Sequence, residues 1–111
     1  MDETALFKAL SEETSRAILV HTSGQARSAA DLADEIGVSQ STIYRRAEEL
    51  QTNDLLQDEI EIDTGGDHHK VYRARIERLE VDIRDDELTY HVEWREDGAD
   101  RLTRIWEDIR G

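Results

Sequence analysis

A run of eight residues combines the side chains that proteins use to contact nucleic acids. Short hydroxyl and amide groups come first, and a phenol and two guanidinium groups follow within the next helical turn. The candidates are Ser39, Gln40, Ser41, Thr42, Tyr44, Arg45 and Arg46. Hydroxyl and amide groups hydrogen-bond phosphates and base edges, and arginine pairs with guanine in the major groove. The run predicts contacts with DNA if a helix presents it outward.

Helical geometry predicts which of these side chains face outward. At about 100° per residue, the apolar positions share one side of a helix: Ile43, Ala47 and Leu50. Arg45 falls on the opposite side, and we expect it to contact DNA. Tyr44 is expected to do the same, with a half-buried position at the edge as the alternative. Arg46 lies nearer the flank, where a phosphate contact and a surface salt bridge are both open.

A second candidate set follows a predicted turn. Residues 64–67 (Thr-Gly-Gly-Asp) are typical of a turn, because glycine tolerates positive φ. Four basic candidates come next: His68, His69, Lys70 and Arg73. Residues 65–76 are the one clearly basic stretch, so we expect contact with phosphates or the minor groove, with a solvated loop as the alternative. Adjacent histidines rarely face one ion and no further ligands are evident, so no metal site and no cofactor are predicted.

Four helices and two hairpins are expected to position these residues. Capping serines and aspartates, a glycine stop at Gly37 and apolar periodicity predict helices over 2–10, 12–22, 29–36 and 39–52. Alternating apolar residues predict strands over 56–62 and 70–76, a second hairpin over 79–94 and, after it, a helix over 97–110.

This order of elements predicts an α+β fold. Three helices followed by a glycine-tipped hairpin are the order of a winged helix-turn-helix. We expect such a domain over residues 1–76, with a C-terminal β-hairpin and helix extension over residues 77–111 for dimerisation or signal input.

The sequence resembles the ArsR-like winged helix-turn-helix transcriptional regulators. The resemblance rests on residues 13–19 and 31–50 and on the strand at 70–73, and residues 37–43 (Gly-Val-Ser-Gln-Ser-Thr-Ile) are close to the family's consensus. It implies a homodimer on operator DNA, with the recognition helix in the major groove and the wing on the backbone. The family's metal-binding motifs are missing, because the chain has no cysteine and residues 97–110 have no histidine. The second hairpin is not part of the common pattern.

The charge balance resembles that of a protein from a salt-accumulating haloarchaeon. The net charge is −13 on 111 residues, and Lys8 and Lys70 are the only lysines among 14 basic residues. Such a charge self-repels at ordinary ionic strength and is screened in molar salt. An acidic mesophilic protein is the alternative. Binding would bring DNA phosphates close to the many carboxylates of the protein. We therefore expect cations such as K⁺ to be retained at the DNA interface.

Several classes of protein are excluded. No cysteine means no disulfide framework and no thiolate metal site. The longest aliphatic run, residues 17–20, is too short for a membrane, and acids interrupt any signal sequence. No spacing resembles a catalytic constellation. We therefore expect a soluble, cytoplasmic protein that is not an enzyme and does not bind membranes.

An apolar stripe near the C-terminus predicts a dimer. The interface candidates are Leu6, Phe7, Leu102, Ile105, Trp106 and Ile109. A stripe this large must pack on a partner copy or on the chain's own first helix. Together these features predict a homodimeric, sequence-specific regulator that binds double-stranded DNA at a palindromic operator. A winged-helix protein–protein adaptor and a ligand or redox sensor are the alternatives.

Overall fold

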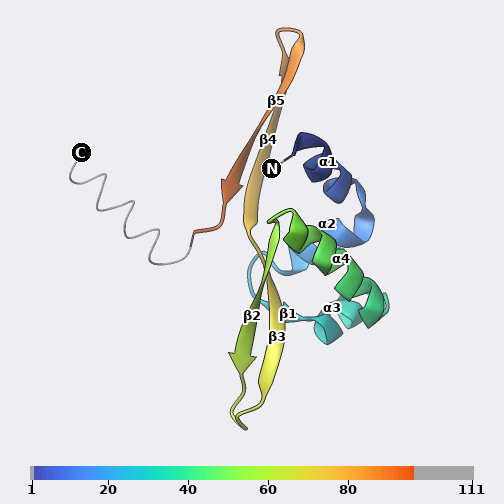
Figure 1. Cartoon of the computed structure of the whole chain (residues 1–111), viewed down its shortest axis with the longest axis vertical. Coiled ribbons are helices and arrows are strands. Elements are labelled where there is room, and N and C mark those ends of the chain that lie inside the picture. The colour runs from blue at the N-terminus through green and yellow to red at the C-terminus, as the bar shows by residue number, and fades with distance from the viewer. Residues whose placement is uncertain (1, 97–111) are drawn as a thin grey trace, which may run out of the picture.

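A computed structural model describes residues 2–96 and shows a winged helix-turn-helix fold with a second hairpin (Figure 1). The helices are α1 (Glu3–Ser11), α2 (Glu13–His21), α3 (Ala29–Ile36) and α4 (Gln40–Thr52). The strands are β1 (Arg27–Ser28), β2 (Leu56–Ile62), β3 (His68–Ala74), β4 (Ile76–Arg84) and β5 (Glu87–Trp94). The predicted α+β class is confirmed, whereas the predicted helix over 97–110 lies outside the described residues.

Local capping explains where the helices begin and end. The side chains of Asp2, Ser28 and Ser39 accept hydrogen bonds from backbone N–H groups in the first turns of α1, α3 and α4. Each satisfies a donor that the helix itself cannot pair. Gly37 ends α3 in the left-handed conformation at φ 85°, where a side chain would be strained. This turn fixes the angle at which the chain enters α4.

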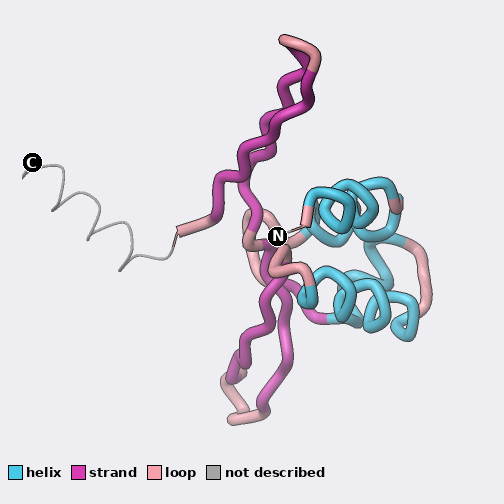
Figure 2. Tube along the Cα trace, turned by 45° about the horizontal axis from the view of Figure 1, so that its top comes forward, coloured by secondary structure: helices cyan, strands magenta, loops and turns pink. Residues whose placement is uncertain are grey.

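Two antiparallel sheets follow from the pairing of the strands. The first has the order β1-β3-β2, with Leu56 opposite Ala74 and Ile62 opposite His68. Its hairpin, β2 and β3, is the wing. The return strand begins at His68, two residues before the predicted start, and β1 was not predicted. The second sheet is the β4–β5 hairpin, and the two hairpins extend from the helical body in opposite directions (Figure 2).

The core lies between the helices and the inner ends of the strands. Its fully buried members come from every helix and from the wing: Leu6, Ile18, Leu32, Ile43, Leu50, Leu55 and Tyr72. Leu6, one of the residues predicted at a dimer interface, is fully buried within its own chain, and the predicted interface stays a prediction. The base of the β4–β5 hairpin also packs against this core.

The remaining predicted interface residues divide between the body and the C-terminal segment. Phe7 is half-buried and meets the Tyr90 ring edge-to-face, with 6.0 Å between the ring centres. Leu102, Ile105, Trp106 and Ile109 lie outside the described residues. Within the part that the structure describes, no helix is long and apolar enough to cross a membrane.

Candidate nucleic-acid interface

The N-terminus of α4 presents a cluster of hydroxyl groups. Ser39 Oγ accepts a hydrogen bond from the Thr42 backbone N–H at 3.2 Å and lies 3.1 Å from Ser41 Oγ and 2.9 Å from Thr42 Oγ1. Ser39, Gln40 and Ser41 are exposed. Free N–H groups and the positive end of the helix dipole favour an anion at such a terminus. The cluster can therefore contact a phosphate or the edge of a base.

The outward face of α4 follows the predicted helical periodicity. Ile43, Ala47 and Leu50 are fully buried, whereas Tyr44 is 50% exposed and Arg45 is exposed. Among residues 2–96, Arg45 has no ion-pair partner. Its guanidinium group is therefore free to bind an external acceptor, and DNA contact by Arg45 and Tyr44 stays a prediction.

Arg46 is tied to the rest of the molecule. Its Nε lies 3.2 Å from Glu12 Oε2, and its Nη1 donates to Glu49 Oε2 at 3.2 Å. The side chain is only 26% exposed. Of the two alternatives that the sequence left open, the structure shows the salt bridge, which joins α4 to the start of α2. Glu12 could not be identified as the partner from the sequence, because the contact depends on how the helices pack.

A carboxylate of the opposite strand pairs with Lys70, which lies in the outer half of the wing. Lys70 Nζ lies 3.3 Å from Asp58 Oδ2 and 5.6 Å from the centre of the Tyr72 ring. The hydrogen bond to Asp58 raises the pKa of the Lys70 ammonium above its ordinary value. Asp58 lies directly opposite Tyr72 in the ladder, one diagonal step from Lys70. Lys70 therefore already has a carboxylate partner in the free protein, which competes with any phosphate.

The tip of the wing is organised around Asp63. Asp63 Oδ1 accepts hydrogen bonds from the backbone N–H groups of Gly65 and Asp67, each at 2.9 Å, and Asp63 Oδ2 lies 2.9 Å from His69 Nε2. The hydrogen bond with Asp63 raises the pKa of the His69 imidazole, and the same bond lowers the pKa of Asp63. His68 is exposed and, among the described residues, has no ion pair.

Arg73 is the remaining basic candidate of the wing. It is half-buried opposite Gln57, and its Nε is enclosed without a hydrogen-bond partner. It has no carboxylate partner in the described part of the chain. Arg73 is therefore a cation without an ion pair at the inner end of the wing, as far as the described residues go.

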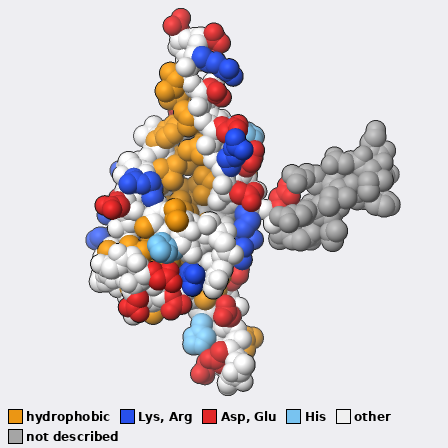
Figure 3. Space-filling view, turned by 180° about the vertical axis from the view of Figure 1, so that it is seen from behind, with side chains coloured by type: hydrophobic (Ala, Val, Ile, Leu, Met, Phe, Trp, Pro, Cys, Tyr) orange, Lys and Arg blue, Asp and Glu red, His pale blue; other side chains and the backbone are white. Residues whose placement is uncertain are grey.

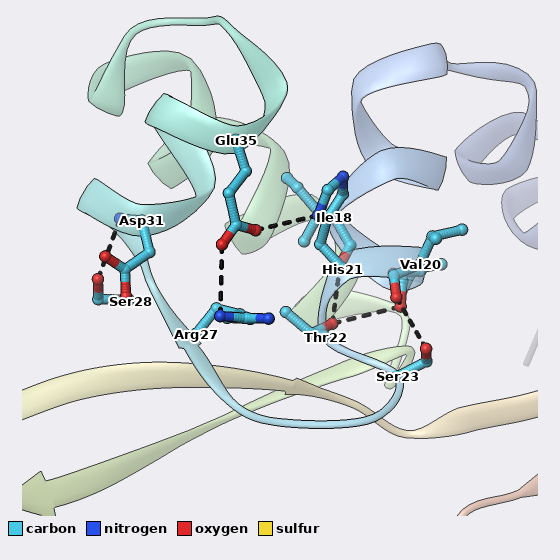
Figure 4. Close-up of polar contacts among 10 residues, drawn as sticks. Ile18, Val20, His21, Thr22, Ser23, Arg27, Ser28, Asp31 and Glu35 are labelled. Carbon is cyan, nitrogen blue, oxygen red and sulfur yellow. Dashed lines mark hydrogen bonds and ion pairs between the residues drawn. The ribbon is translucent and has the colours of Figure 1, made fainter.

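A polar clamp that the sequence did not predict holds α3 in place (Figure 4). Glu35 Oε2 lies 3.0 Å from His21 Nδ1, and Glu35 Oε1 lies 3.3 Å from Arg27 Nη1. One carboxylate thus joins α3 to the end of α2 and to β1. The sequence carried no signal for this clamp, because its three members are separated by loops and β1 has only two residues.

The described residues offer no group of three His, Cys, Asp or Glu side chains that could hold a metal ion. His68 and His69 leave adjacent positions of β3 and so point to opposite faces of the wing. The pairing of His69 with Asp63 turns its ring toward the tip. The two imidazoles are therefore not arranged to bind one ion.

The fold and the exposed face of α4 define a winged helix-turn-helix protein. Residues 10–58 match the model of a family described as a helix-turn-helix domain. This match includes α2, α3, α4 and the start of the wing. It supports a DNA-binding regulator, whereas the narrower resemblance to ArsR-like regulators stays a prediction.

A solved structure shares the fold. The "possible transcriptional regulator" from Methanosarcina mazei Go1 aligns with a TM-score of 0.50 at 17% identity, over 65% of this chain and 63% of that one. This chain therefore spans less than two thirds of the length of that structure. None of the curated proteins matches the sequence.

Proposed function

We propose that this chain is a sequence-specific, non-catalytic transcriptional regulator that binds a palindromic DNA operator as a homodimer in a high-salt cytoplasm. The observation that carries the proposal is Arg45, which is exposed on α4 without a carboxylate partner among residues 2–96. Hydroxyl groups at the start of α4 lie on the same helix. This combination fits a helix whose first turns enter the major groove.

The remaining candidates divide into backbone contacts and groups that must first exchange partners. On this proposal Ser39 and Thr42 contact phosphates beside the groove, and Tyr44 packs against the DNA at the edge of α4. Lys70 and His69 approach the backbone through the wing, where Asp58 and Asp63 already hold them. Cations such as K⁺ are retained between these carboxylates and the phosphates.

Substitution of Arg45 tests the assignment of α4. Arg45→Ala should weaken operator binding by about 1–3 kcal/mol and relax the preference for one base pair, because a bidentate contact with a guanine is lost. Arg45→Lys keeps the charge and should still lose part of the specificity, since an ammonium lacks the rigid planar fork of the guanidinium group. The measurement is fluorescence anisotropy on operator variants, with the operator first identified by selection from random DNA in molar KCl.

Arg84→Ala is the matched control. Arg84 lies at the tip of the β4–β5 hairpin, at the far end of the molecule from the wing (Figure 1), and its loss removes the same charge. If Arg45→Ala binds the operator as tightly as Arg84→Ala does, α4 is not the recognition helix.

A protein–protein adaptor is the second candidate, and the acidic wing favours it. Asp58, Glu59, Glu61 and Asp63 lie along β2 and the turn that follows it, opposite only two cations on β3, Lys70 and Arg73. Such a surface repels phosphates at low salt. If the protein is an adaptor, selection from random DNA should enrich no sequence. This should hold at every KCl concentration at which circular dichroism shows a folded protein.

A further inference from the structure

One face of the β4–β5 hairpin is apolar along its length. Three cross-strand pairs form it: Leu79 with Val92, Val81 with Tyr90, and Ile83 with Leu88. The opposite face is polar and carries ion pairs, Arg78 with Glu80 at 2.7 Å and Arg84 with Asp82 at 3.8 Å. An amphipathic two-stranded hairpin is stable only if its apolar face packs against something.

The chain's own body covers only the base of this face. Leu79, Tyr90 and Val92 pack against the core. Farther out, the exposed fractions are 42% for Val81, 43% for Leu88 and 80% for Ile83. Figure 3 shows the apolar side chains as a continuous band that runs from the body up the hairpin. The outer half of the band has no cover among residues 2–96.

A groove adjoins the covered half of the same face. It lies between α2 and the base of β4, has a volume of about 330 Å³, and is lined mainly by apolar side chains: Leu10, Leu19, Val20, Ile76 and Leu79. Val20 is 69% exposed. Leu79 belongs both to the groove and to the apolar face of the hairpin. One side of the molecule thus carries an exposed apolar arm and, next to it, an apolar groove.

We propose that a second copy of this chain covers both features, with the two hairpins packed face to face and antiparallel about a two-fold axis at Val81. At about 3.3 Å per residue, Ile83 lies as far beyond Val81 as Leu79 lies before it. Ile83 of each copy therefore lies over the groove of the other. Such self-complementarity is what a two-fold interface requires. The inference concerns the homodimer of the proposed function and is independent of DNA contact by α4.

Charge complementarity supports the same register. The tip of the hairpin carries Asp85, Asp86 and Glu87, all exposed. Asp85 lies four residues from Val81 toward the tip of the hairpin. Glu77, a residue of the groove wall, lies four residues from Val81 toward the base. Arg16, also in that wall, has no carboxylate partner among the described residues. The register sets Asp85 of one copy against Glu77 of the other, and the two arginines of the same wall, Arg16 and Arg78, outnumber that carboxylate.

The size of the contact favours inclusion of the groove. Stable dimers bury about 1,200–2,000 Å² in total, more than Val81, Ile83 and Leu88 of two copies provide. The groove and the exposed Val20 add a second apolar area on each copy. An interface made of arm and groove together therefore meets the requirement better than two arms alone.

The absence of native cysteine makes the proposed register directly testable. Val81→Cys places one thiol at the two-fold axis, and a short bismaleimide should join two copies into a covalent dimer. Asp82→Cys is the matched control: it lies one residue farther along and points to the polar face, so it should not cross-link. Both are tested in the full chain in molar KCl, with circular dichroism to verify folding and sedimentation to measure mass.

A second variant tests the energetics. Ile83→Asp alters an exposed side chain of the monomer and should raise the dissociation constant of the dimer at least about 100-fold, because two apolar contacts are lost. A wild-type chain that sediments as a monomer overturns the inference. A dimer that Val81→Cys does not cross-link also overturns it, since another surface, such as residues 102–109, then joins the copies. Arg45→Ala must leave the dimer intact, which separates this result from a failure of the proposed DNA contact.

Discussion

Replacement of Asp58 by Asn tests whether the wing contacts DNA through Lys70. In the free protein, Lys70 Nζ lies 3.3 Å from Asp58 Oδ2, and both side chains are about half exposed. Exposed ion pairs of this kind contribute only about 0–1 kcal/mol to stability, so the variant should stay folded. It removes a carboxylate that repels phosphate and releases the ammonium group that can bind one.

The expected change is in the salt dependence of binding. Each cation that neutralises a phosphate contributes about −0.9 to the slope of log affinity against log salt concentration. One released lysine in each of two subunits therefore makes the slope more negative by about 1.8. Loss of the carboxylate also removes a place where a cation is retained, which acts in the same direction.

The salt dependence of the wild-type protein follows from the same count of cations that bind phosphates. Arg46, His69 and Lys70 already have carboxylate partners, which leaves Arg45 and Arg73 as unmatched cations among the candidates. Two such residues in each of two subunits give a slope no steeper than about −3.6. Cations retained near Glu48 and the wing carboxylates oppose this release, so we predict a shallow or positive slope over molar KCl concentrations and poor folding below them.

The assay is an anisotropy titration of operator DNA across KCl concentrations, with circular dichroism at each concentration. Asp82→Asn is the matched control, because it removes one carboxylate from the polar face of the other hairpin. If both variants change the slope equally, the effect comes from net charge and Lys70 does not contact DNA. A steep negative slope for a wild type that stays folded at low salt would refute the retained cations and the high-salt setting.

Two further predictions concern the body and the tip of the wing. Leu50→Ala should lower the free energy of unfolding by about 2–5 kcal/mol in urea titrations, because the fully buried side chain leaves a cavity. The pKa of His69, followed by NMR, should lie above the ordinary value of about 6.5 and return to it in Asp63→Asn. The pairing therefore stabilises the turn below about pH 6.5 and is lost as pH rises through the raised pKa of His69. The pKa of Asp63 is lowered, so the stability that its carboxylate gives the turn is lost as pH falls through this lowered pKa. An ordinary pKa for His69 would contradict its hydrogen bond with Asp63. An unchanged free energy of unfolding in Leu50→Ala would contradict the burial of Leu50 in the core.

The helices were predictable because their signals are local. Ser28 and Ser39 cap α3 and α4, and Gly37 takes the left-handed conformation between them, as the sequence predicts. These signals depend on residues within one turn of each other. Strand β1 carries no such signal, since two residues show no periodicity, and its position depends on pairing with the distant β3.

The charge of the wing could not be predicted from counts along the chain. Residues 65–76 are basic as a segment, but β3 lies beside β2, which carries Asp58, Glu59 and Glu61. The register places Asp58 within reach of Lys70, and the turn geometry brings Asp63 to His69. The net charge that matters is that of both strands of the hairpin together, and this net charge is negative. Leu6 is the analogous case for packing, because its burial depends on how α1 meets the other helices.

The distribution of paired and unpaired cations bears on how recognition works in concentrated salt. Counterion release supplies little affinity when the bulk solution already holds molar cations. Hydrogen bonds to base edges depend far less on salt, so a regulator under these conditions gains most from direct readout. Arg45 on α4 remains without a carboxylate partner in the described structure, whereas Lys70 and His69 on the wing are held by Asp58 and Asp63. Under the proposed function, α4 therefore supplies specificity, and the wing contacts the backbone through exchangeable pairs that suppress nonspecific binding.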